Sequence, residues 1–176
     1  MEFNLGYKTD MGRIPGSDDM NSDSIITRLV VRSDVNDIFL WRNDEGSRSQ
    51  SLNTEPVAWV DHQGWIQSVM ISSRHCLLMC CDKTSAASVG VVRFDMGNDD
   101  TLISINLAPS FRGRGLGKHC LNAAIHFFSC HYQSVKPVRA EIRPENLASQ
   151  KAFQGAGFKF LHSTNDIITL TRQMIS

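Results

Sequence analysis

The spacing of apolar and polar residues predicts structured elements from residue 25 onward. Residues 25–31 form a β-branched, apolar run that is typical of a strand. Ser33 is then placed to cap a short helix, whose apolar stripe includes Trp41 and which ends near Asn43. One strand followed by one short helix is therefore expected at the start of the folded region.

The next stretch, from Glu45 to Glu55, is rich in Ser, Asn and Gly, and we expect it to be a surface loop. Asp61 is placed to cap a second helix that carries Trp65 and Val69 on its apolar face. Turn-rich segments of a length that suits antiparallel hairpins separate the strand-like runs that follow. These runs are residues 75–81, 88–94 and 101–107.

The C-terminal half alternates helices and strands. Apolar residues recur at i, i+3, i+4 and i+7 in the helix expected from Leu116 to about His131. A strand at 138–143, a helix at 146–156 and a hairpin at 158–171 follow. The order β-α-α-β-β-β-α-β-α-β-β, without an internal repeat, predicts a mixed α/β (α+β) layer fold.

Residues 1–24 differ in composition from the rest of the chain. They contain several glycines and a polar run, with few large apolar residues, so we expect a flexible N-terminal arm before a single domain at 25–176. Lys plus Arg balance Asp plus Glu at 18 each, which favours a small, locally recognised ligand over nucleic acid or a membrane surface. We expect a monomer or homodimer.

The cysteines and the apolar runs favour a cytoplasmic location. The five cysteines are odd in number and lack paired C-x-x-C spacing, so we expect reduced, mostly buried thiols and no metal site. No apolar run approaches the roughly 18 residues of a membrane span, and residues 1–10 lack the pattern of a signal peptide.

The most informative segment is Arg112–Gly117, RGRGLG, between a predicted strand and a predicted helix. Glycines let the backbone approach a ligand closely, and N–H groups at a helix start bind phosphate. Arg112 and Arg114 add charges that suit phosphate oxygens. A Walker A loop is excluded because His119 stands where Ser or Thr is needed. A dinucleotide fingerprint is a weak match, because Lys118 stands in place of its third glycine and the flanking strands lack the repeated βαβ pattern.

These residues resemble the acetyl-CoA signature of the GNAT acetyltransferase superfamily, [R/Q]-x-x-G-x-[G/A]. In this chain Arg112, Gly115 and Gly117 occupy its three defined positions. A second segment, Asn146 to Phe158, resembles the superfamily's other coenzyme-contacting stretch, and the similarity extends over roughly 25–171. It implies a mostly antiparallel sheet of six to seven strands with about four helices on its faces. It also implies an acetyl-CoA-dependent N-acetyltransferase whose coenzyme contacts are Leu107, Ala108, Arg112, Gly113, Arg114, Gly115, Leu116, Gly117, Lys118, Asn146, Ser149 and Phe153.

Acetyl transfer to an amine needs a base, an oxyanion donor and a proton for the leaving thiolate. Glu141 lies five residues before Asn146, at the offset of the catalytic glutamate in the ribosomal-protein N-terminal acetyltransferases that this stretch resembles; a solvent-facing strand residue is the alternative. The superfamily's usual tyrosine is replaced by Phe153, which leaves water or Ser149 as the proton donor. By the resemblance, a backbone N–H near Asn106 or Leu107 is the expected oxyanion donor.

Two motifs resemble the acceptor side of related enzymes: Trp41-Arg42-Asn43, and His62 followed by Trp65. They are similar to motifs of the branch that acetylates nucleotide-linked amino sugars in the pseudaminic acid pathway, and of the ribosomal-protein branch. A nucleotide-linked amino sugar is the favoured acceptor, with a protein N-terminus as the alternative. Both tryptophans also fit core positions, and a non-catalytic acyl-CoA-binding module is a third hypothesis.

Overall fold

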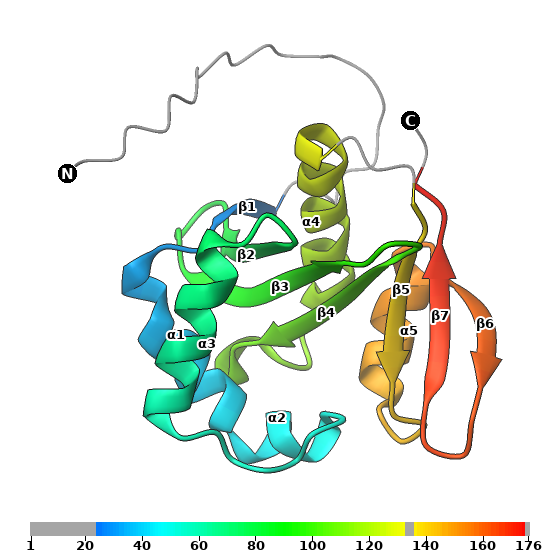
Figure 1. The fold of residues 1–176 in the computed structure, drawn as a ribbon, viewed down its shortest axis with the longest axis horizontal. Helices are drawn as coiled ribbons and strands as arrows, with labels where there is room; N and C mark the ends of the chain where they lie inside the picture. The colour runs from blue at the N-terminus through cyan, green and yellow to red at the C-terminus, as the bar shows by residue number, and fades with distance from the viewer. Residues whose placement is uncertain (1–23, 133–135, 175–176) are drawn as a thin grey trace.

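The computed structural model describes residues 24–132 and 136–174, which form a seven-stranded sheet with helices on both faces (Figure 1). The predicted N-terminal arm lies outside the described residues except for Ser24. The strands are β1 (Ile25–Leu29), β2 (His75–Asp82), β3 (Ser88–Met96), β4 (Thr101–Leu107), β5 (Val138–Ile142), β6 (Lys159–Ser163) and β7 (Ile168–Arg172).

Six neighbour pairs join the strands in the order β1-β2-β3-β4-β5-β7-β6. Among the strands that the structure describes, only β4 and β5 run parallel, and the helix α4 (Leu116–Tyr132) connects them. The other pairs are antiparallel; short connections join β2 to β3, β3 to β4 and β6 to β7, whereas residues 30–74 lie between β1 and β2. The mostly antiparallel sheet of six to seven strands is therefore confirmed.

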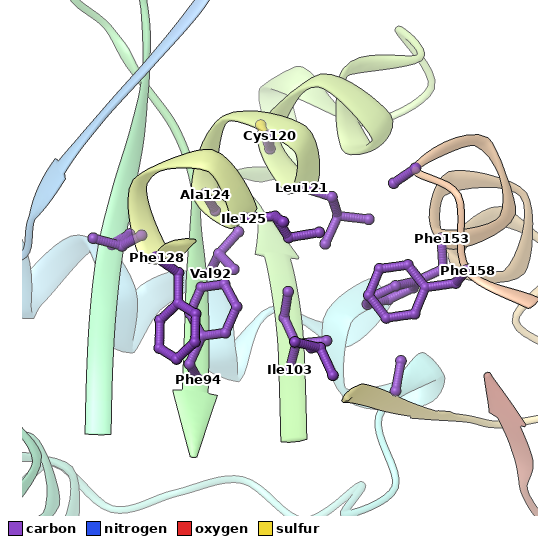
Figure 2. Close-up of a cluster of buried hydrophobic side chains, with 14 of the residues drawn as sticks. Val92, Phe94, Ile103, Cys120, Leu121, Ala124, Ile125, Phe128, Phe153 and Phe158 are labelled. Carbon is purple, nitrogen blue, oxygen red and sulfur yellow. The ribbon is translucent and has the colours of Figure 1, made fainter. Parts of the chain in front are cut away.

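The helices pack on the sheet in two layers. Buried residues of α1 (Val35–Asn43) and α3 (Trp59–Ile71) share one core cluster with β2 and β3. Buried residues of α4 and α5 (Leu147–Gly155) form the larger cluster on the opposite face. In this cluster the rings of Phe94 and Phe128 stack with centroids 4.2 Å apart (Figure 2).

Strand β2 contributes side chains to both core clusters. Its six central residues, 76–81, are all buried, because alternate side chains enter opposite clusters. Cys76 and Leu78 pack toward α4, whereas Leu77 and Met79 pack toward α1 and α3. An unbroken apolar run is therefore the correct pattern for a central strand here.

Three predictions about the N-terminal helices were wrong. Helix α1 begins at Val35, after a 3-10 turn, and the carboxylate of Asp34 rather than the Ser33 hydroxyl accepts the Val31 N–H at 2.8 Å. Helix α3 begins two residues before Asp61, which therefore lies in the first turn instead of capping it. The predicted loop at 45–55 contains α2 (Glu45–Gln50), which brings the described residues to five α-helices.

All five cysteines are free thiols, and four of them are buried. Cys130, near the C-terminal end of α4, is the exposed one, so the prediction of mostly buried thiols is confirmed. Over the described residues, no helix is long and apolar enough to cross a membrane.

Candidate functional site

The parallel strands β4 and β5 pair only at their beginnings. Their register covers Thr101↔Val138 and Leu102↔Arg139, although both strands continue beyond these pairs. Figure 1 shows the two strands diverging toward the end of the sheet where α2 lies. The divergence leaves the β4 backbone beyond Leu102 without a partner strand on this side, which is the arrangement expected for an N–H donor near Asn106.

The glycine loop lies between the end of β4 and the start of α4. Gly113 and Gly115 have φ values of +73° and +75°, which glycine adopts without the Cβ strain of other residues. An added Cβ would meet no atom within 4 Å at either position, so this side of the loop is open to a ligand. The open loop leads into the N-terminus of a 17-residue helix, whose first N–H groups and dipole favour an anion.

The Arg112 side chain points to α2 instead of projecting freely from this loop. Its guanidinium pairs with the Asp44 carboxylate and donates to the Ser47 hydroxyl at 2.7 Å and the Leu107 carbonyl at 3.3 Å. Ser47 in turn donates to the Asn106 side chain at 2.9 Å. Arg112 therefore connects the glycine loop, the end of β4 and α2 through one hydrogen-bonded network.

The charge of Arg114 has a different environment. Arg114 is exposed, and its guanidinium lies 5.1 Å from the ring centroid of Phe111. Among the described residues, Arg112 forms an ion pair with Asp44, whereas Arg114 forms none.

The second predicted coenzyme segment begins at the N-terminus of α5. Asn146 caps this helix, because its side-chain oxygen accepts the Ser149 N–H at 3.0 Å. Its amide nitrogen donates to the Gln50 carbonyl at 3.2 Å, so α2 contacts both halves of the divided sheet. Phe153 is buried and packs edge-to-face on Phe158, with centroids 5.0 Å apart.

Glu141 lies on the opposite side of β5 from the core. The alternate residues Ala140 and Ile142 are buried in the α4 cluster, which turns Glu141 toward the other face. Its carboxylate accepts from Arg139 at 2.5 Å, and Arg139 also pairs with Asp100 at 2.7 Å. The carboxylate is therefore half-buried and held in place by an ion pair.

A cavity of about 900 Å³ joins these features. It is lined by the glycine loop, by the diverging ends of β4 and β5, and by parts of α1, α2, α3 and α5. The predicted site residues that line it are Arg42, His62, Trp65, Leu107, Arg112, Gly113, Gly115, Leu116, Gly117, Lys118, Glu141, Asn146, Ser149 and Phe153. Four others, Trp41, Asn43, Ala108 and Arg114, do not.

Trp41 and Asn43 have structural surroundings. Trp41 is 9% exposed and belongs to the α1 and α3 core cluster, which is the core position that the sequence also allowed. Asn43 exchanges two hydrogen bonds with the Val57 backbone, each 2.8 Å long. Trp41 and Asn43 therefore hold α1 in the fold instead of lining the cavity.

His62 lines the cavity but is only 2% exposed. Its Nε2 lies 3.1 Å from the Val35 carbonyl oxygen, which can only accept, so this nitrogen carries the hydrogen. Burial lowers the pKa of His62, and the bond to Val35 opposes this only in part. The side chain is therefore a neutral imidazole packed between aromatic rings at neutral pH.

Sequence reasoning missed the residues of α2. Asp44, three positions before Ser47, caps this helix by accepting the Ser47 N–H at 3.0 Å. Hydrogen bonding to Arg112 lowers the pKa of Asp44 despite some burial. Asp44 could have indicated the start of a helix, because Asp is a favoured helix cap. The helix was missed because Gly46 and two serines have low helix propensity.

A metal site is not among the features of this region. Across residues 24–132 and 136–174, no group of three or more His, Cys, Asp or Glu side chains has the arrangement of a metal site.

A family model described as an acetyltransferase (GNAT) domain matches residues 25–159. This range includes the glycine loop, Glu141 and Asn146. A search of the curated proteins found no match to the chain.

Several solved structures have the same fold. Spermidine N-acetyltransferase from Vibrio cholerae, in complex with CoA and spermine, superposes with a TM-score of 0.75 at 15% identity, covering 85% of this chain and 95% of that one. AAC(6')-Ib in complex with paromomycin and acetyl-CoA gives 0.72 at 16%, covering 86% and 94%. A putative phosphinothricin N-acetyltransferase gives 0.69 at 20%, covering 87% and 100%.

Proposed function

Because the chain belongs to the GNAT acetyltransferase family and is thus an acetyl-CoA-dependent N-acetyltransferase, we propose that its acceptor is the primary amine of a small molecule bound in the 900 Å³ cavity. The observation that carries the proposal is that one cavity joins the glycine loop, the diverging strands and Glu141. This volume lies in the range of small-molecule sites.

The residues of the glycine loop fit the coenzyme. The backbone N–H groups from Gly113 to Lys118 are the proposed ligands of its pyrophosphate, since positive φ angles open the loop and a helix begins there. Arg114 remains available for phosphate charge, whereas Arg112 holds α2. Acetyl-CoA itself supplies the thioester carbonyl.

Glu141 is the proposed general base. It faces the cavity from the strand that diverges from β4, and a carboxylate there can accept the amine proton directly or through one water. A backbone N–H of β4 near Asn106 or Leu107 would stabilise the oxyanion. A free thiol has a pKa of about 8.5, so the leaving thiolate needs only modest help, from water or from Ser149.

The acceptor motifs and the structural relatives suggest different amines. The motifs around Arg42 and His62 suggest a nucleotide-linked amino sugar, with a protein N-terminal amine as the alternative. The relatives were solved with spermine and with an aminoglycoside, which are small-molecule amines. A small-molecule amine is common to the favoured hypothesis and to these relatives, and we therefore place it first.

The test is a panel assay of the full chain with acetyl-CoA, in which release of the free CoA thiol measures turnover. The panel contains a UDP-linked amino sugar, a peptide with a free N-terminus, spermidine and kanamycin. Acetylation of a small-molecule amine above the peptide, with the acetylated product identified by mass spectrometry, supports the proposal. Acetyl-CoA binding without transfer to any amine would instead favour the non-catalytic acyl-CoA-binding module.

The five free thiols further suggest that the protein works in a reducing compartment such as the cytoplasm. Fractionation of cells that express the full chain, followed by detection of the chain in each fraction, tests this placement.

A further inference from the structure

Arg42 supplies a positive charge to the acceptor side of the cavity. Its Nη2 donates to the carbonyls of Asn53 and Glu55, at 3.0 and 3.3 Å, so neutral oxygens hold this side of the guanidinium. Its Nη1 is buried and has no hydrogen-bond partner among the residues that the structure describes. A buried donor of a charged group that lacks an acceptor is costly, which points to a ligand oxygen.

The charge of Arg42 is also uncompensated. No carboxylate pairs with Arg42 within the described part of the chain. Burial lowers the pKa of Arg42, and the nearby Arg48 lowers it further, yet an arginine stays protonated at neutral pH. Arg48 donates to the carbonyls of Asn43 and Thr54 and does not line the cavity.

A second arginine on the cavity wall has a similar spare donor. Arg93 pairs with Asp95 at 2.9 Å through Nη2, and its guanidinium carbon lies 5.6 Å from the ring centroid of Trp65. Its Nε is buried without a partner among the described residues. Trp65 also lines the cavity, so an aromatic ring and a cation are available together on this wall.

The charged side chains that line the cavity are mostly basic. Among the described lining residues, Glu141 is the only acid, and it already pairs with Arg139. The basic lining residues are Arg42, Arg93, Arg112, Lys118, Arg143 and Lys151. Carboxylates pair with Arg93, Arg112 and Arg143, so among the described residues a polycationic amine would meet the charges of Arg42, Lys118 and Lys151 and no free carboxylate.

Resting on the proposed acetyltransferase function, we propose that the acceptor is a primary amine that also carries a phosphate or carboxylate group, and that Arg42 binds this anionic group. The planar guanidinium fork suits either group, because two parallel N–H···O bonds match their oxygen spacing. Anion binding would supply a counter-charge to Arg42, and a rotation of the guanidinium toward the cavity would give Nη1 an acceptor. Arg42 thus selects against polyamines as well as for anionic amines.

The test compares matched amines on the wild-type chain. Glucosamine 6-phosphate against glucosamine examines the phosphate arm, alanine against alaninamide examines the carboxylate arm, and spermidine is the polycation. We expect the anionic member of at least one pair to have a kcat/KM at least about tenfold above its neutral partner, with spermidine lowest. Which pair responds identifies the anionic group.

Two variants assign the preference to a residue. Arg42→Gln should reduce the anionic-to-neutral ratio of kcat/KM to near unity, whereas Arg48→Gln removes a neighbouring charge outside the cavity and should keep the wild-type ratio. A wild-type preference for neutral amines or spermidine, or a ratio that Arg42→Gln leaves unchanged, overturns the proposal.

Calorimetric binding of the same amines in the presence of CoA separates this proposal from the proposed function. Arg42-dependent binding of an anionic amine without any acetyl transfer would support the site and contradict the proposed enzymatic role. Turnover with a neutral amine or spermidine preferred would support the enzyme and overturn the anionic acceptor. If neither anionic amine binds more tightly than its neutral partner, the site proposal fails.

Discussion

At the scale of single residues, the side chain of Glu141 points away from the core and toward the cavity. Its strand neighbours Ala140 and Ile142 enter the core, whereas Glu141 faces the cavity beside Arg139. If Glu141 is the base, Glu141→Gln should lower kcat by roughly 10²–10⁴ and leave acetyl-CoA affinity nearly unchanged. Steady-state rates and calorimetry measure the two effects.

The matched control for Glu141 is Glu145→Gln. Glu145 is an exposed carboxylate that pairs at 3.4 Å with Arg143 and does not line the 900 Å³ cavity, so this variant should retain wild-type kcat. The pH profile of kcat/KM should also lose its lower limb in Glu141→Gln if that limb belongs to Glu141. An active Gln variant with the wild-type profile would show that Glu141 is an ordinary strand residue.

His62 leads to a prediction about stability. Burial lowers its pKa in the folded state, so the unfolded chain binds more protons between the folded pKa and about 6.5. The free energy of unfolding should therefore rise with pH across this window and fall as the pH drops below about 6.5. Urea unfolding of wild type and of His62→Gln at pH 5 and pH 7.5 measures this contribution.

The pH dependence should be weaker in His62→Gln than in wild type, whatever the variant costs at neutral pH. His126→Gln changes an exposed histidine on α4 and should keep the wild-type dependence. Equal pH dependence in wild type and His62→Gln would show that His62 does not titrate as its burial requires.

Elements with an apolar period could be predicted, and α2 could not. Helix α4 places five buried residues at helical spacing, and β2 is one continuous apolar run, so burial and period agree. Helix α2 has Ser47 as its one buried residue and contains Gly46, which disfavours a helix. Contacts to Arg112 and Asn146, distant in sequence, hold it instead.

Asp44 stabilises the N-terminus of α2. It caps the helix and pairs with Arg112, and loss of a helix cap costs about 1 kcal/mol. Asp44→Ala should increase amide hydrogen exchange at residues 45–50 and raise the acceptor KM more than the KM of acetyl-CoA. Asp99→Ala, in an exposed turn, is the control. Unchanged exchange at 45–50 would contradict the role of Asp44 in holding α2.

The glycine loop leads to a prediction about the coenzyme. Gly115→Val places a β-branched residue at φ +75°, so it should weaken acetyl-CoA binding more than about tenfold by distorting the loop and blocking phosphate approach. Gly64→Ala on α3 is the control, because its added Cβ meets no atom within 4 Å and its backbone is helical. Calorimetry should find wild-type affinity in this control, and wild-type affinity in Gly115→Val would contradict a phosphate site at the loop.

At the scale of the whole molecule, the sequence predicted the glycine loop and the order of the elements apart from α2, but not how these elements pack together. The divergence of β4 from β5 depends on pairing between strands that a 17-residue helix separates. From the sequence, Arg112 was predicted to bind phosphate. The structure shows that its guanidinium instead forms an ion pair with Asp44. Contacts between distant segments carry no local periodicity, so the composition of the cavity required the structure.

The boundary of the domain gives the last prediction. The described fold begins at Ser24, and the composition of the preceding residues predicts that they add no core. A chain beginning at Asp23 should therefore keep the wild-type melting temperature within about 2 °C, because small surface changes alter stability by less than 1 kcal/mol. Differential scanning calorimetry of both chains measures this.

A chain beginning at Val30 is the matched control, because it also lacks β1. Ile25 is 5% exposed in the core, and Arg28 pairs with the buried Asp34 at 2.6 Å, so this deletion removes packing and leaves a carboxylate without its cation. At a cost of about 3 kcal/mol or more, its melting temperature should fall by at least roughly 6–12 °C. A comparable fall in the chain that begins at Asp23 would show that the first 22 residues stabilise the domain.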